Sequence, residues 1–156
     1  MSYENFEKAM ELAKTLPDYK IYDCCSDKAM DELEDYLGFE LSKQHYEFLR
    51  KGALEVWAYE FCANFKNSHK TSFDIIAHLE INKKYGLKVD KKFVPLIDED
   101  EWNNYLNYNK LTKDGEPTIV YAVPSPDEFI IFEQTNQDLG DFLLELFNEI
   151  KENDEE

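Results

Sequence analysis

Residues 118–150 decide the fold, and they read TIVYAVPSPDEFIIFEQTNQDLGDFLLELFNEI. The apolar run at residues 118–123 predicts a strand, the proline-containing segment 124–127 a turn, and residues 129–132 a second strand that pairs back on the first. Apolar residues then recur every three or four positions, which predicts an amphipathic helix. They are Leu139, Phe142, Leu143, Leu146, Phe147 and Ile150. A hairpin followed by a helix indicates a fold that combines antiparallel strands with helices.

Two further strands are predicted on the N-terminal side of this stretch. Residues 93–97 are apolar, and Pro95 within them indicates an edge strand or a bulge, because proline cannot donate a ladder hydrogen bond. Residues 102–108 alternate in the manner of a strand, and the acidic residues 98–100 predict the turn between the two. Asp114-Gly115 predicts the turn that leads into the next strand.

The N-terminal half predicts four helices, because apolar residues fall at helical spacing and a proline or glycine follows each run. Their ranges are Phe6–Leu16, Ser26–Gly38, Ser42–Gly52 and Thr71–Gly86. Lys20–Asp23 predicts a short extended piece. Residues 53–66 are aromatic with partial alternation, which predicts a strand or hairpin, while helical spacing stays open as an alternative there.

Together these elements predict an α+β fold, with a largely antiparallel sheet covered by N-terminal and C-terminal helices. Thr135 and Asp138 have the spacing of a capping box, which predicts Thr135 as the residue that begins the last helix. A chain of 156 residues suits one domain. We therefore predict a single domain over residues 1–151 and an acidic tail over residues 152–156.

Charge is the strongest compositional signal. The formal net charge is -17, and residues 101–156 alone hold 3 basic and 14 acidic side chains. Such a surface repels nucleic acid and anionic membranes, which both require basic side chains, so neither is an expected partner. It attracts cationic proteins and speeds their encounter. Solubility alone is the competing interpretation.

Motifs for catalysis or metal binding are missing from the sequence. With five glycines, none adjacent to another, it has no glycine-rich phosphate loop. Residues 98–101 resemble the start of a calcium loop, but Asn103 stands where that loop needs glycine and Asn109 where it needs glutamate. Acidic residues occur throughout the chain, so they single out no catalytic pair. We expect no metal, no cofactor and no enzymatic activity.

Histidine and cysteine fit the same interpretation. His45 and His78 fall on predicted helices and are expected at the helix surface or at the rim of the core, and no histidine has a partner at metal-ligand spacing. Three cysteines without a Cys-x-x-Cys motif favour a reducing compartment, and the N-terminus has no apolar signal segment, so we expect a cytoplasmic protein. Cys24-Cys25 is expected as two reduced thiols, although a redox site or a strained disulfide stays open. Cys62 is expected as a small core residue.

One stretch resembles a known family. Residues 41–49 read LSKQHYEFL and lead to Gly52, and an acidic helix with Glu34 and Leu37-Gly38 precedes them. This order resembles the signature of the SUKH superfamily, in which an acidic helix with Leu-Gly is followed by Leu-Pro-x-x-Tyr-x-x-Phe-Leu and a glycine turn. Ser42 stands where the family often has proline.

The second half of the chain agrees with the family in the order of its elements. An apolar strand ends in acidic residues, an aromatic strand follows, and Asp-Gly-Glu-Pro at residues 114–117 forms the next turn. A phenylalanine-rich helix closes the chain. The resemblance therefore covers residues 26–150.

The resemblance implies an α+β domain that binds and neutralises a cognate polymorphic toxin, commonly a nuclease or a deaminase that acts on nucleic acid. A relative in yeast regulates cell-wall synthesis, so an intracellular scaffold or regulatory protein-binding module is the alternative. An enzyme with an unrecognised carboxylate site is the third hypothesis.

A toxin that acts on nucleic acid has to present a cationic groove, and an acidic surface can occupy or flank that groove. We therefore predict toxin binding at acidic turns around an exposed tryptophan. The predicted residues are Asp98, Glu99, Asp100, Glu101, Trp102, Glu116, Asp127 and Glu128. The competing interpretation is a solvated cluster of turns with Trp102 in the core. The oligomeric state and the identity of the toxin stay open.

Overall fold

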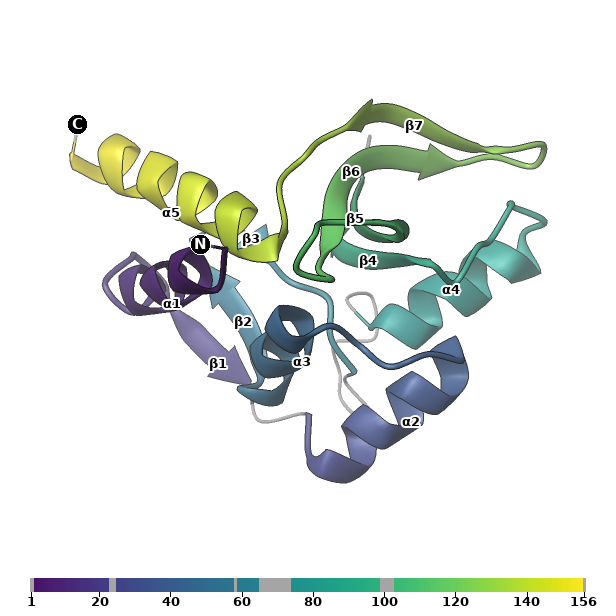
Figure 1. The fold of residues 1–156 in the computed structure, drawn as a ribbon, viewed down its shortest axis with the longest axis horizontal. Coiled ribbons are helices and arrows are strands. Elements are labelled where there is room, and N and C mark those ends of the chain that lie inside the picture. The colour runs from purple at the N-terminus through teal and green to yellow at the C-terminus, as the bar shows by residue number, and fades with distance from the viewer. Residues whose placement is uncertain (1, 23–24, 58, 65–73, 99–102, 156) are drawn as a thin grey trace.

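The computed structural model describes residues 2–22, 25–57, 59–64, 74–98 and 103–155, and within them it confirms the predicted α+β fold (Figure 1). These ranges hold five helices and seven strands, and the strands form two antiparallel sheets instead of the one expected. The elements are α1 Ser2–Ala13, β1 Lys20–Tyr22, α2 Asp27–Leu37, α3 Lys43–Arg50, β2 Ala53–Val56, β3 Tyr59–Glu60, α4 Ile75–Lys84, β4 Phe93–Asp98, β5 Asn103–Leu111, β6 Pro117–Pro124, β7 Phe129–Gln134 and α5 Leu139–Glu155.

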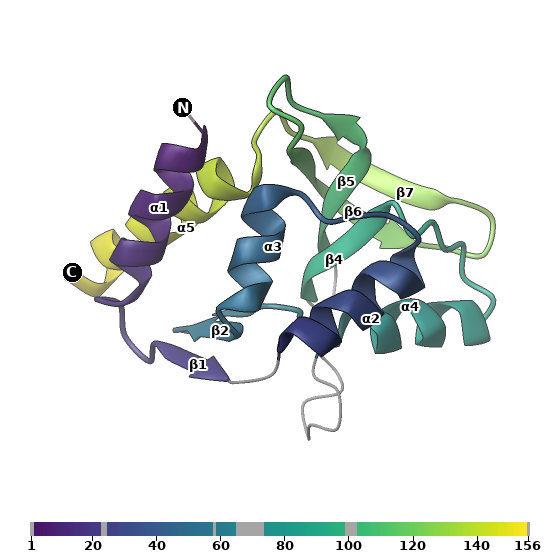
Figure 2. The same cartoon turned by 60° about the horizontal axis from the view of Figure 1, so that its bottom comes forward.

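The small sheet has the order β1-β2-β3 and lies near the two terminal helices. Helices α1 and α5 lie side by side in Figures 1 and 2, although they come from opposite ends of the chain. Near their first turns the Asn5 side-chain amide donates to Asp141 Oδ1 at 2.8 Å. Phe6 and Met10 of α1 and Phe147 of α5 belong to one cluster of buried apolar residues. The first and last helices are therefore held together by apolar packing.

The larger sheet has the order β4-β5-β6-β7. Pro95 lies in the edge strand β4 beside a register shift, which confirms both readings of that proline. Phe93 and Phe129 begin the two edge strands, yet their rings stack with centroids 4.4 Å apart. The sheet must therefore curl strongly, because three strand spacings in a flat sheet span about 14 Å. The Lys88 backbone N–H also donates to the Ser125 carbonyl at 2.8 Å, which holds the β6–β7 hairpin near the end of α4.

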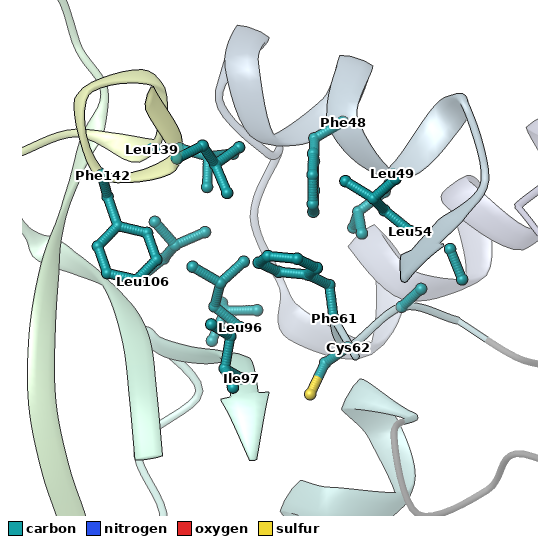
Figure 3. Packing of buried hydrophobic residues seen from close by; sticks show 14 of the residues in the cluster. Phe48, Leu49, Leu54, Phe61, Cys62, Leu96, Ile97, Leu106, Leu139 and Phe142 are labelled. Atoms are coloured by element: carbon teal, nitrogen blue, oxygen red, sulfur yellow. The ribbon is translucent and has the colours of Figure 1, made fainter. Parts of the chain in front are cut away.

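Phe61 connects the two sheets. Its backbone N–H donates to Leu54 of β2 at 3.1 Å, and it forms an isolated bridge with Ile97 of β4. Its ring meets those of Phe48 and Phe147 edge-on, at centroid distances of 5.4 and 6.3 Å. Figure 3 shows this ring between Phe48 of α3 and the side chains of β4. The core is therefore continuous from one sheet to the other.

The next residue, Cys62, donates its backbone N–H to the Leu96 carbonyl at 2.8 Å. Its side chain is buried among apolar neighbours, as predicted. Cys25 is also buried, whereas Cys24 lies outside the described residues.

The structure confirms the predicted starts of two helices, α2 and α3. Ser26 and Ser42 cap α2 and α3 as expected, by accepting from the N–H groups of Ala29 and His45. Asp74 caps α4, while the predicted start at residues 71–72 lies outside the described residues.

The predicted capping box of α5 was wrong. Asp138 itself is the cap, since its carboxylate accepts from the Asp141 N–H at 2.9 Å. The Thr135 hydroxyl instead donates to the Ile119 carbonyl in β6. At its other end α5 runs on to Glu155, and residues 152–154, expected in the tail, are exposed residues of this helix.

Candidate functional site

The predicted toxin-binding residues are only partly described. Residues 99–102, which include Trp102, lie outside the described residues. Asp98 ends β4, where it pairs with Asn103 of β5. Asp127 and Glu128 are exposed in the turn after β6, whereas Glu116 precedes that strand. These three residues therefore lie at opposite ends of β6 and do not form one patch.

The prediction that Glu116 contributes to an acidic surface was wrong, because its side chain is only 5% exposed. Its carboxylate accepts from the backbone N–H of Gln44, in the first turn of α3, at 3.5 Å. Burial raises the pKa of Glu116, and the nearby charges of Asp138 and Asp114 raise it further. The helix N-terminus attracts this carboxylate into the protein, away from any partner.

Gln44 and Asp138 extend this buried polar cluster and join two helix starts. The Gln44 side-chain amide donates to Asp138 Oδ2 at 3.3 Å, and its oxygen accepts from the Gly140 N–H at 2.8 Å. Gln44 and Asp138 are each 1% exposed. These contacts position α3 against α5, so the cluster is structural.

Replacing Asp138 with alanine is expected to lower the free energy of unfolding by about 2 kcal/mol, measured by urea denaturation. The change removes the α5 cap and leaves the buried Gln44 amide without its acceptor. Asp141→Ala is the matched control, since it removes a half-buried carboxylate one turn later and should cost less than about 1 kcal/mol. Equal losses in the two variants would contradict the structural role of Asp138.

His45 and His78 are buried, contrary to the prediction that they lie at the helix surface or at the rim of the core, and His69 lies outside the described residues. His45 is fully buried, and its Nδ1 lies 2.8 Å from the Tyr108 hydroxyl. His78 is 8% exposed, and its Nε2 lies 2.8 Å from the Tyr105 hydroxyl. Burial lowers the pKa of His45 to about 3, so the ring is neutral at physiological pH. Among the described residues, no three His, Cys, Asp or Glu side chains come together as a metal site.

An exposed candidate site lies instead between α5 and the two sheets. A pocket of about 200 Å³ opens there, and the glutamates that line it are exposed residues of α5. The residues that line it are Tyr59, Ile97, Asn104, Tyr121, Gln137, Phe142, Glu145, Leu146 and Glu149. Of these, Ile97 and Asn104 lie in the strands on either side of residues 99–102.

A second pocket of about 170 Å³ continues along α5, lined by Pro17, Trp57, Ile150, Asn153 and Asp154. The rings of Trp57 and Tyr59 lie 6.1 Å apart and link the two pockets on the sheet side. On the helix side, Glu149 lines the first pocket and the next residue, Ile150, lines the second. We call the two pockets together the acidic groove. None of the described residues that line it is basic.

Trp57 is the feature of this groove that sequence reasoning missed. Residues 53–66 were predicted as a strand or hairpin, and β2 and β3 do form an antiparallel hairpin. Trp57 follows β2 in its turn with a φ of 55°. This conformation is rare for a bulky residue and leaves the side chain 47% exposed. The sequence does predict that Glu145 and Glu149 are neighbours on the exposed face of the last helix, because they are four residues apart and lie outside its apolar stripe.

No protein-family model and no curated protein matches this chain. Within the described residues, no helix has the length and apolar character needed to cross a membrane.

Proposed function

We propose that this protein is an immunity protein, which binds a cognate polymorphic toxin through an acidic surface and neutralises it. The toxin is a nuclease or a deaminase that acts on nucleic acid, and the immunity protein acts in the cytoplasm without catalysis. The acidic groove carries the proposal, since it combines exposed carboxylates with an exposed tryptophan. Aromatic anchors surrounded by polar groups are the usual centres of protein interfaces.

Electrostatics supports a cationic partner over a neutral one. The net charge of -17 produces a long-range field that raises the rate of encounter with a basic surface. Proteins that act on nucleic acid need a basic surface for their substrate. An acidic protein that occupies this surface competes directly with the substrate.

The test is binding of the purified protein to the toxin domain encoded beside its gene, at about 0.1 M and about 1 M salt. Over this range the Debye length falls from about 10 Å to about 3 Å, which screens attraction between surfaces. We expect tight binding at the lower concentration and at least a tenfold slower association, on the order of what screened steering predicts, at the higher one. Co-expression should restore growth to cells that carry the toxin domain.

Tight binding that does not depend on salt would support the immunity function, but it would mean that apolar residues and not acidic ones form the interface. Absence of binding and of protection would refute the proposal. The scaffold or regulatory module would then be the better hypothesis, since it predicts several partners of modest affinity.

A further inference from the structure

Strand β7 forms an open edge of the larger sheet. It pairs with β6 on one side, and no other described strand pairs with it. Figure 1 shows it along the outer border of the molecule. An edge strand presents backbone N–H and C=O groups that can pair with a strand of another chain. This edge is therefore a surface to which a partner can add a strand.

The accessible part of this edge is its second half. At the start of β7, the Phe129 ring packs on Phe93 of β4, with centroids 4.4 Å apart. Further along, Ile131, Phe132 and Glu133 are exposed, and Phe132 is 62% exposed. Phe132 lies at the register shift and has no Cα partner in β6, as in a β-bulge, which changes the direction of a side chain. The edge therefore presents an apolar side chain to solvent.

The two faces of this edge have different chemistry. Ile131 pairs with Ala122 of β6, and Glu133 pairs with Tyr121. Paired residues lie on the same face of a sheet, and consecutive residues of β6 lie on opposite faces. Ile131 and Glu133 therefore lie on opposite faces. A strand that pairs with this edge meets an apolar side chain on one face and a carboxylate on the other.

Glu133 also connects the edge to the acidic groove. Its pairing residue Tyr121 lines the main pocket, as do Glu145 and Glu149 of α5. Burial raises the pKa of Tyr121, and the charges of Glu133, Glu145 and Glu149 raise it further. The three carboxylates therefore lie close enough to act on one residue. A partner that contacts the groove can reach the β7 edge as well.

Charge decides between a strand of another protein and a second copy of this chain. Residues 114–150 contain no lysine or arginine, and Glu133 is exposed on β7. Lys88 approaches the hairpin at its turn, through a backbone contact with Ser125, at the other end of β7 from Glu133. Two copies of a chain with a net charge of -17 repel each other. The edge therefore fits a strand with basic side chains.

We infer that the partner protein adds a strand to the β7 edge, with basic side chains on the face of Glu133 and apolar side chains on the face of Ile131. The inference rests on the proposed function for the identity of the partner, a toxin domain with a basic surface. Main-chain hydrogen bonds hold such a strand, and its alternating side chains give specificity. The added strand covers the exposed ring of Phe132 and continues the larger sheet.

The experiment follows hydrogen exchange of the isotope-labelled protein by NMR, alone and in complex with the toxin domain encoded beside its gene. Amides of β7 that donate to β6 exchange slowly in both samples, whereas those that face the open edge exchange fast in the free protein. We expect the edge-facing amides of residues 130–134 to slow by at least about tenfold in the complex. A partner that only covered side chains would not protect these amides selectively.

Phe132→Lys tests the same edge by binding, because a lysine on an edge strand disfavours pairing and repels a cationic strand. Leu111→Lys is the matched control, since Leu111 is 51% exposed in β5, which has a strand on each side. We expect Phe132→Lys to weaken toxin binding at least about tenfold, and Leu111→Lys to stay within about twofold of the unchanged protein. Equal weakening would mean that net charge decides the affinity, which would overturn the inference.

Sedimentation of the protein alone tests the competing occupant, a second copy of the chain. We expect a monomer, because the like charges of two copies repel each other. A dimer that Phe132→Lys dissociates would show that a second copy covers the edge, and the inference would be wrong.

The edge inference and the immunity function can fail separately. If the toxin domain is bound and neutralised while the β7 amides exchange as fast as in the free protein, the edge inference is wrong and the immunity function stands. If the toxin domain protects the β7 amides but keeps its activity in cells, the edge inference stands and the immunity function is wrong. If the toxin domain does not bind, both are wrong.

Discussion

Gly52→Ala is expected to lower the free energy of unfolding by about 3 kcal/mol, a large part of the 5–15 kcal/mol typical of a domain. Gly52 joins α3 to β2 with a φ of 116°, a conformation that side chains with a Cβ rarely adopt. An alanine Cβ would lie 2.6 Å from the Tyr22 carbonyl oxygen and 2.7 Å from Ile21 Cγ2. The oxygen belongs to a backbone paired with β2, so it cannot move without disturbing the small sheet.

Gly38→Ala provides the matched control for this prediction. Gly38 also has a positive φ, 86°, but an added Cβ would meet no atom within 4 Å. Its replacement should therefore cost only the conformational strain, about 1 kcal/mol. Urea denaturation followed by circular dichroism measures both variants. If they lose the same stability, the close approach to β1 has no energetic weight and the prediction is wrong.

Local patterns explain why so many elements were predictable from the sequence. Helix α2 is an example, because Ser26 caps its start and Gly38 ends it with the expected left-handed conformation. Both signals act within one turn of helix and need no tertiary contact. The way in which the two sheets join was not predictable, because Phe61 contacts both β2 and the distant strand β4. Such pairings bring together segments distant in sequence, and hydrophobic alternation does not specify them.

In the candidate site, too, contacts between segments distant in sequence were not predictable. Asp127 and Glu128 were correctly expected at an exposed turn, since a proline-containing acidic loop rarely folds inward. Glu116 follows an equally polar turn, yet the first turn of α3 draws its carboxylate into the protein. The groove was missed because its two walls, Trp57 and α5, are separated by about half of the chain. A charge or an aromatic residue is visible in the sequence, but its neighbours across the fold are not.

Acid is expected to destabilise this protein through His45. Its folded-state pKa of about 3 lies below the ordinary value of 6.5, so only the unfolded chain takes up this proton between these two values. Stability therefore falls as the pH drops from 6.5 towards 3, by about 1.4 kcal/mol per pH unit. The loss from this one ring reaches about 3 kcal/mol at pH 4.5. Glu116 acts in the opposite direction, because its raised pKa favours proton uptake in the folded state.

His45→Gln separates the two contributions, since glutamine does not titrate and can still hydrogen-bond to the Tyr108 hydroxyl. The measurement is the free energy of unfolding in urea at pH 7, 6, 5 and 4.5, for the variant and the unchanged protein. We expect the variant to start less stable at pH 7 and to lose about 3 kcal/mol less than the unchanged protein on acidification. Glu116 is present in both proteins, so its contribution cancels in this difference. If the variant and the unchanged protein lost the same free energy of unfolding on acidification, His45 would have to take up its proton in the folded state. Its burial and its contact with Tyr108 argue against this.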